Sequence, residues 1–167
     1  MVSNIKEDRI ELQEKVETAL RNLVQEALVY KNSDRYIFLT DEQQEVVYDV
    51  INRLLSSLES KNDTSFVING EAGTGKTIVA INIISKLMSE YNLMVDHSDI
   101  PLETLSPIKQ TERRLREYIL KHGKLKIAFV VPMTSLRKTL SRVMRENGMK
   151  GIVMGPSEIQ NDKYDLL

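Results

Sequence analysis

A glycine-rich octapeptide constrains this chain more than any other feature. Residues 70–77 read GEAGTGKT and fit the pattern G-x-x-x-x-G-K-[ST] at every specified position. Average residue frequencies produce that pattern by chance in about one of two hundred chains of this length. A β-prone run, residues 65–69, precedes the loop, and an apolar helical pattern over residues 77–88 follows it. We therefore expect a buried strand, a glycine loop and a helix in that order.

The residue types in this loop suit the phosphates of a nucleoside triphosphate. Gly70, Gly73 and Gly75 permit a tight turn whose backbone N–H groups face the anion. The start of the following helix adds further N–H groups and the positive end of its dipole. Lys76 supplies a mobile charge for the β- and γ-phosphates, and the Thr77 hydroxyl is a ligand for Mg²⁺. The predicted site comprises Gly70, Glu71, Ala72, Gly73, Thr74, Gly75, Lys76 and Thr77, with Lys76 and Thr77 as its catalytic pair.

Helices and strands alternate along the chain. Helices are predicted over residues 5–31, 41–59, 77–88, 108–121 and 134–147, and short strands over 65–69, 126–131 and 151–155, with another opening at 164–167. Thr40 and Gln43 have the T-x-x-Q spacing of a capping box, which places the start of the second helix. The alternation favours a mostly parallel sheet with helices on both faces.

Composition removes several functional classes. The 167 residues contain no cysteine and two histidines, which excludes a disulfide framework, a thiolate metal site and a cysteine nucleophile. No apolar run approaches the ~20 residues of a membrane span. Because the N-terminus runs into charged sequence rather than a signal peptide, we expect a cytoplasmic protein without a membrane partner.

Charge is distributed unevenly. Residues 121–150 contain eight basic residues and one acidic residue, a net charge of +7, whereas the rest of the chain carries −8. A solvated helix face is the usual meaning of such a run, and a nucleic-acid surface is the alternative. Thr134 and Ser135 place two hydroxyl groups where the basic helix begins, which suits either an N-cap or a phosphodiester contact.

Four ordered elements resemble the schlafen group 3-like DNA/RNA helicase domain, a superfamily 1 helicase-like P-loop ATPase. They read LTDEQQEVVYDVI, FVINGEAGTGKT, IAFVVPMTSLRKTL and GIVMGPSEI, and the match runs from about residue 38 to residue 167. The resemblance implies an α/β fold, a RecA-like P-loop NTPase three-layer sandwich, which binds ATP and Mg²⁺ and acts on single-stranded DNA or RNA. It implies that Gln43 reads adenine, although the capping box alone explains this residue. It also implies that the single-stranded nucleic acid is contacted by Pro132, Thr134, Ser135, Arg137 and Lys138.

This resemblance divides the chain into an N-terminal amphipathic helical segment, residues 1–35, and the N-terminal part of a RecA-like domain, residues 36–167. The Asp-Glu pair of a Walker B element, a second RecA-like domain and the arginine that completes the ATP site do not appear. Phosphoryl transfer needs an acid to hold Mg²⁺ and positive charge at the γ-phosphate. We therefore expect this chain by itself to bind ATP without appreciable hydrolysis.

Two other functions fit parts of the pattern. One is a non-catalytic nucleotide-binding or regulatory module. The other is a small P-loop kinase, which is disfavoured because about 65 residues precede the first expected strand and no acceptor site is visible.

Overall fold

The computed structural model of the chain describes residues 10–22, 39–71, 73–88, 100–146, 148–159 and 162–166. The chain divides into two compact units. The first contains Met1–Val29 and Ala128–Asp162, and the second contains Tyr30–Ile127 and Lys163–Leu167.

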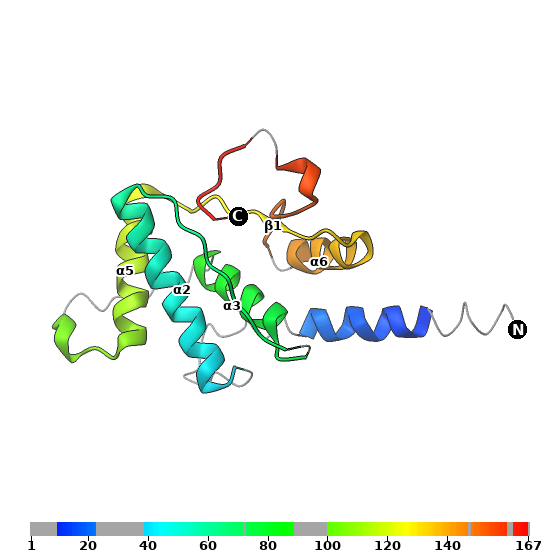
Figure 1. The fold of residues 1–167 in the computed structure, drawn as a ribbon, viewed down its shortest axis with the longest axis horizontal. Helices are drawn as coiled ribbons and strands as arrows, with labels where there is room; N and C mark the ends of the chain where they lie inside the picture. The colour runs from blue at the N-terminus through cyan, green and yellow to red at the C-terminus, as the bar shows by residue number, and fades with distance from the viewer. Residues whose placement is uncertain are drawn as a thin grey trace, which may run out of the picture. The chain divides into compact units, whose positions relative to one another are not determined.

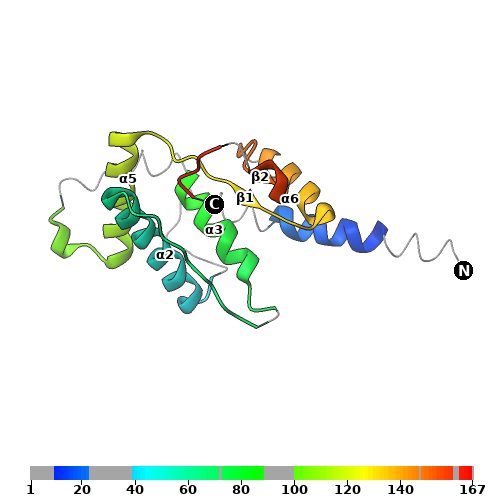
Figure 2. The same cartoon turned by 45° about the horizontal axis from the view of Figure 1, so that its top comes forward.

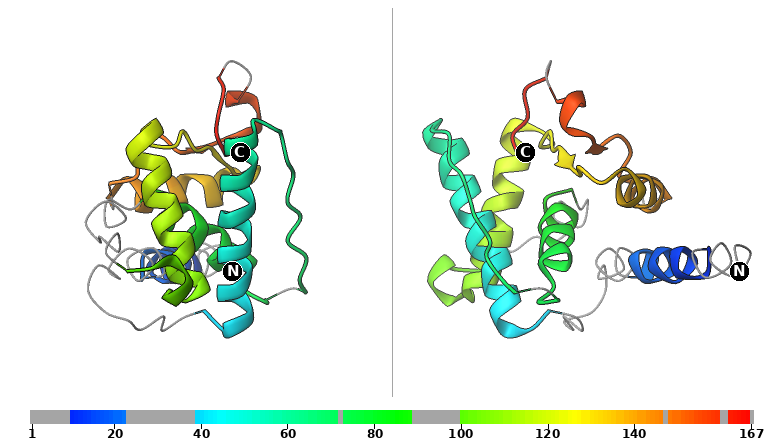
Figure 3. Two further views of the ribbon diagram at one scale, coloured as in Figure 1. Left: turned by 90° about the vertical axis from the view of Figure 1, so that its left-hand side faces the viewer. Right: turned by 45° about the vertical axis from the view of Figure 1, so that its right-hand side comes forward.

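The second unit is built on three helices, α2 (Asp41–Ser60), α3 (Lys76–Met88) and α5 (Pro107–His122), with a short 3₁₀ turn, η1 (Leu102–Thr104). Helix α2 packs against both α3 and α5, and it lies beside α5 in Figures 1 and 3. Apolar side chains recur on one side of each helix and form the core between them. The largest fully buried ones are Ile51, Leu55, Ile81 and Leu115.

Local signals set the helix ends. The Thr40 hydroxyl accepts from the backbone N–H of Gln43, and the Gln43 side chain accepts from the backbone N–H of Thr40, so the capping box of α2 is confirmed. Ser106 caps α5, which starts at Pro107, a residue suited to the first helical position. Gly123 ends that helix at a φ of 92°, a backbone conformation that glycine adopts without strain.

The strand predicted over residues 65–69 is wrong. Residues 62–70 are extended but pair with no strand among the described residues, and the Val67 side chain is 81% exposed. This segment returns from the C-terminal end of α2 to the glycine loop (Figures 1 and 3). A β-prone sequence forms a strand only where a neighbouring strand supplies hydrogen bonds and a buried face. In the described part of the chain, no strand lies beside these residues, and Phe66 and Ile68 are no more than half-buried.

The first unit contains a small parallel sheet. Strand β1 (Phe129–Val130) pairs with β2 (Val153–Met154) in the register Phe129 with Val153 and Val130 with Met154. The helix α6 (Thr134–Glu146) connects them and packs on β2, and the 3₁₀ turn η2 (Pro156–Glu158) follows (Figure 2). The predicted strand–helix–strand order and its parallel pairing are therefore confirmed, although both strands are shorter than predicted.

The N-terminal helix also belongs to the first unit. Residues 10–22 are helical, while the rest of the helix predicted over 5–31 lies outside the described residues. Glu17 pairs with Arg142 of α6, and Arg21 lies 3.5 Å from Glu146 of the same helix. Charge complementarity therefore links this helix to α6.

The sheet formed by the described residues has two strands, fewer than the sheet of a three-layer sandwich. Apart from the β1–β2 pair, one parallel bridge joins Ile127 to Leu166 within the second unit, where the sequence predicted the opening of a strand. The α/β alternation is thus present, with an incomplete sheet. Among the described helices, none is long and apolar enough to span a membrane.

Candidate nucleotide-binding site

The glycine loop lies between the extended segment 62–70 and the first turn of α3. Gly73 and Gly75 have φ angles of 84° and 85°, a left-handed conformation that side chains with a Cβ rarely adopt. The backbone itself therefore requires glycine at positions 73 and 75. Ala72, which the sequence assigned to the same loop, lies outside the described residues.

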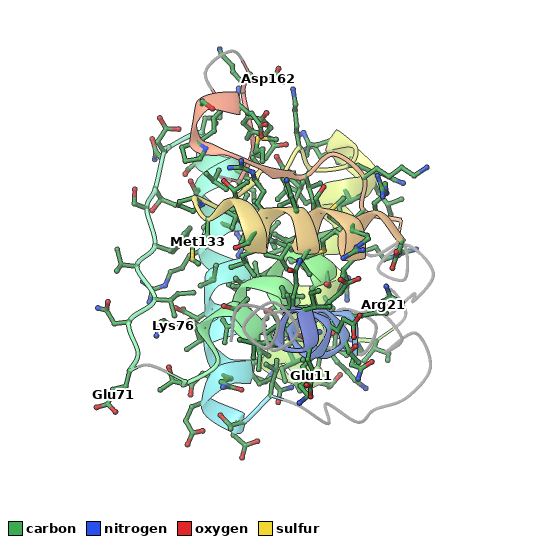
Figure 4. All side chains as sticks on the ribbon, turned by 90° about the vertical axis from the view of Figure 1, so that its right-hand side faces the viewer. Glu11, Arg21, Glu71, Lys76, Met133 and Asp162 are labelled. Carbon is green, nitrogen blue, oxygen red and sulfur yellow. The ribbon has the colours of Figure 1, made fainter. Side chains whose placement is uncertain are left out.

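Lys76 is the first residue of α3, and its ammonium group turns back onto the loop. Its Nζ atom donates to the carbonyl oxygens of Gly70 at 2.8 Å and Glu71 at 2.7 Å. The hydroxyl of Thr74 donates to the same Glu71 carbonyl at 2.9 Å. Figure 4 labels Lys76 and Glu71, both at the surface. The loop thus gathers a cation and a hydroxyl donor around one backbone carbonyl, and a competing anion would find both donors there.

Thr77 is the second residue of α3 and is exposed. The N–H groups of the first turn of a helix lack acceptors within the helix, and the dipole places partial positive charge there. The Thr77 hydroxyl therefore lies where an anion and its counterion would bind. The described residues contain no group of three or more His, Cys, Asp or Glu side chains that could hold a metal ion.

Gln43 is the one residue outside the octapeptide that contacts the loop through a side-chain hydrogen bond of the described structure. Its Nε2 atom donates to the backbone carbonyl of Thr74 at 2.9 Å, across 31 positions of sequence. The packing of α2 on α3 brings this side chain to the loop. The resemblance to an adenine-reading residue predicted Gln43 at the site, and the contact with Thr74 was not predicted.

A polar cluster that the sequence did not reveal joins the three helices of the second unit. The Tyr48 hydroxyl donates to Glu112 at 2.7 Å and accepts from Lys86 at 2.8 Å, and the Lys86 ammonium lies 4.8 Å from the centre of the Tyr48 ring. Burial lowers the pKa of Lys86, and the charge of the nearby Glu112 carboxylate raises it by a smaller amount. In the sequence, the one sign of this cluster is that Lys86 interrupts the apolar pattern of α3, and that pattern does not identify Tyr48 and Glu112 as its partners.

The candidate nucleic-acid segment lies in the first unit. Pro132, Thr134, Ser135 and Lys138 are exposed at the end of β1 and the start of α6. Arg137 differs, because it is half-buried and its guanidinium donates to the carbonyl of Val131 at 3.3 Å.

The Arg137 guanidinium also covers Gly155, which follows β2. A Cβ atom on Gly155 would lie only 3.0 Å from the Cζ atom of Arg137. The sequence predicted a phosphate contact for Arg137, and the structure gives it contacts with the ends of both strands. Gly155, which the sequence did not identify as important, leaves room for the Arg137 guanidinium because it has no Cβ atom.

Residues 36–165 match the family described as "Type III restriction enzyme, res subunit". The match covers most of the chain, and the domain of that family is a helicase-like P-loop domain with a RecA-like α/β fold. No solved structure matches the chain.

Proposed function

Because the chain belongs to the type III restriction enzyme res-subunit family, we propose that its glycine loop binds the phosphates of ATP together with Mg²⁺. The geometry of the loop carries this proposal. Two glycines at φ angles of 84° and 85° shape a turn, and the Lys76 ammonium lies over its carbonyl groups. A triphosphate would exchange those neutral acceptors for charged oxygens, which hydrogen bonds to ammonium groups favour.

The residues present fit a magnesium nucleotide. The phosphates themselves supply most of the charge that Mg²⁺ requires, and a single hydroxyl ligand from the protein is common at such loops. Thr77 is exposed at the start of α3 and is the candidate for this role. Glu71, Thr74 and the remaining loop residues would contact the phosphates through their backbone.

A titration with a fluorescent ATP analogue and Mg²⁺ tests the proposal. Lys76→Ala removes one charge-assisted interaction, which corresponds to about 10- to 100-fold weaker binding. Lys109→Ala is the matched control, because Lys109 is an exposed lysine on α5 of the same unit. Equal binding by the wild type and Lys76→Ala, or equal losses in both variants, would contradict the assignment.

We also propose that single-stranded DNA or RNA binds at Pro132, Thr134, Ser135, Arg137 and Lys138. Exposed hydroxyls at the first turn of α6 and an adjacent lysine can contact phosphates, and residues 128–150, the part of the basic stretch that lies in the same unit, contain five basic residues and one acidic residue. Arg137 would act from its half-buried position by holding the loop after β1 beside Gly155.

Oligonucleotide binding at several salt concentrations distinguishes a local contact from general charge. Lys138→Ala should weaken binding and reduce the dependence of the logarithm of affinity on that of salt by about 1. Lys150→Ala removes the same charge from an exposed position of the same unit and should have a smaller effect. Identical effects of the two variants would leave only non-specific attraction.

A closer kinship with the schlafen group 3-like helicase domains is part of the same proposal, and the four ordered sequence elements support it. In such a protein, ATP binding and strand binding are linked. Affinity for the nucleotide that rises when a single strand is added would support the helicase-like function, whereas affinity indifferent to the strand would favour the non-catalytic nucleotide-binding module. Turnover that is stimulated by the strand and lost in Lys76→Ala would identify a motor.

A further inference from the structure

The side chain of Gln43 is held at both ends of its amide group. Its Oε1 atom accepts from the backbone N–H of Thr40 at 3.1 Å, and its Nε2 atom donates to the carbonyl of Thr74 at 2.9 Å. The first bond belongs to the helix cap, and the second reaches the glycine loop. A half-buried amide with both groups bonded has one orientation, so Gln43 fixes the loop carbonyl relative to the start of α2.

Gly75 gives an independent sign of this contact. A Cβ atom on Gly75 would lie 2.7 Å from the Nε2 atom of Gln43, closer than real Cβ atoms approach a heavy atom. The backbone of Gly75 also has a φ of 85°. The amide therefore lies directly against the Thr74–Gly75 peptide, one residue before Lys76.

The base of Gln43 is rigid because α2 and α3 form one core. Val47 and Ile51 of α2 and Ile81 of α3 are almost completely buried, and the Lys86 ammonium of α3 donates to the hydroxyl of Tyr48 on α2. A side chain that extends from such a packed pair can restrain a loop that otherwise has few contacts.

We propose that Gln43 is a positioning residue for the phosphate loop, and that it supports binding of the triphosphate group whatever base is attached. An adenine-reading residue would instead act on the base alone. The two roles differ in a measurable way, because a restraint on the loop affects every ligand that carries the phosphates, while a contact with adenine affects ATP only.

The experiment compares ATP, GTP and inorganic tripolyphosphate, each displacing a fluorescent ATP analogue from the full chain in the presence of Mg²⁺. In Gln43→Ala, the affinity for all three should fall by a similar factor of about 3 to 10, the range of one lost hydrogen bond. Thr40→Ala is the matched control, since it weakens the same helix cap and leaves the Thr74 contact in place. Its affinities should stay within about twofold of the wild type.

Amide hydrogen exchange of the unliganded protein supplies a second readout. Loss of the restraint should speed exchange at Gly73, Thr74 and Gly75 in Gln43→Ala and leave it unchanged in Thr40→Ala. This measurement also checks that both variants are folded, through protected amides in α2 and α3.

The outcomes separate the positioning role from the function on which it rests. If the wild type binds none of the three ligands, the proposed triphosphate site fails. If the wild type binds them and Gln43→Ala loses affinity for ATP alone, Gln43 reads the base and the positioning role is wrong. Unchanged affinities and unchanged exchange in Gln43→Ala would also overturn it.

Discussion

Removal of a single hydroxyl group, in Tyr48→Phe, tests how the helices of the second unit are held together. That hydroxyl donates to Glu112 at 2.7 Å and accepts from Lys86 at 2.8 Å, so it connects α2 with both α5 and α3. Without it, the Lys86 nitrogen and the Glu112 carboxylate are 3.9 Å apart, beyond a good hydrogen bond. The variant keeps the aromatic ring and its packing, so that the measured effect belongs to the two hydrogen bonds.

The magnitude follows from the charge and exposure of the partners. Each hydrogen bond to a charged group contributes about 1.5–3 kcal/mol. The side chains of Lys86 and Glu112 are 21% and 29% exposed, so water replaces part of what is lost. We expect Tyr48→Phe to lower the free energy of unfolding by about 2–3 kcal/mol, measured by urea denaturation at pH 7.

Lys86→Met is the companion variant. Burial is the largest cause of the lowered pKa of Lys86, so the folded protein holds this ammonium at a cost. Replacement by an apolar side chain of similar length removes both that cost and the bond to Tyr48, and because the two effects oppose each other we expect a change within about 1 kcal/mol. In the double variant, the loss should be smaller than the sum of the two single losses, because both partners of one bond are then absent.

The pH dependence gives the refuting result. The pKa of Lys86 lies below its ordinary value of 10.5 in the folded state, so between these values the unfolded chain binds more protons. The free energy of unfolding of the wild type, relative to that of Lys86→Met, should therefore rise as the pH increases from the folded-state pKa to 10.5. Below the folded-state pKa this difference should be constant and at its lowest. A difference that does not change up to pH 10.5 would refute the lowered pKa of Lys86. A loss below about 0.5 kcal/mol in Tyr48→Phe would show that the cluster does not hold the helices.

Three further changes probe other parts of the molecule. Leu55→Ala should lower the free energy of unfolding by about 3–4 kcal/mol in urea, because the Leu55 side chain is fully buried in the helical core. Gly155→Ala should displace the Arg137 guanidinium and break its hydrogen bond to the carbonyl of Val131. The free energy of unfolding should fall by about 0.5–1 kcal/mol, the value of one hydrogen bond, whereas a fall of more than about 3 kcal/mol would mean that the guanidinium cannot move. Glu17→Gln should cost less than about 1 kcal/mol at low salt and nothing at 1 M salt, because its partner Arg142 is 43% exposed; a salt-independent loss would contradict an ion pair.

Elements whose causes lie within a few residues of sequence are those that could be predicted. The T-x-x-Q spacing identified the start of α2, and the structure contains both hydrogen bonds of that cap. The two motif glycines at positive φ were predictable from the octapeptide for the same reason, since a tight turn with inward N–H groups excludes a Cβ. The helix predicted over 108–121 is α5, with Ser106 and Gly123 at its two ends.

Elements that depend on distant partners could not be predicted. Residues 65–69 have the composition of a strand, yet strand formation is decided by whether another strand lies alongside. Gln43 shows the same limit for a site. Its distance from Thr40 is a property of the sequence, but its bond to Thr74 exists because α2 packs on α3.

The sequence by itself determined the phosphate loop, the helix periodicity and the caps, because near neighbours decide each of these through backbone sterics and short hydrogen bonds. Tertiary structure alone decided the contact of Gln43 with the loop and the contact of the Arg137 guanidinium with Gly155. It also decided the hydrogen bonds that join Tyr48 to Lys86 and Glu112. Each of these joins residues that lie far apart in the chain. Their energies come from exact distances between packed elements, and a pattern of residue types does not contain those distances.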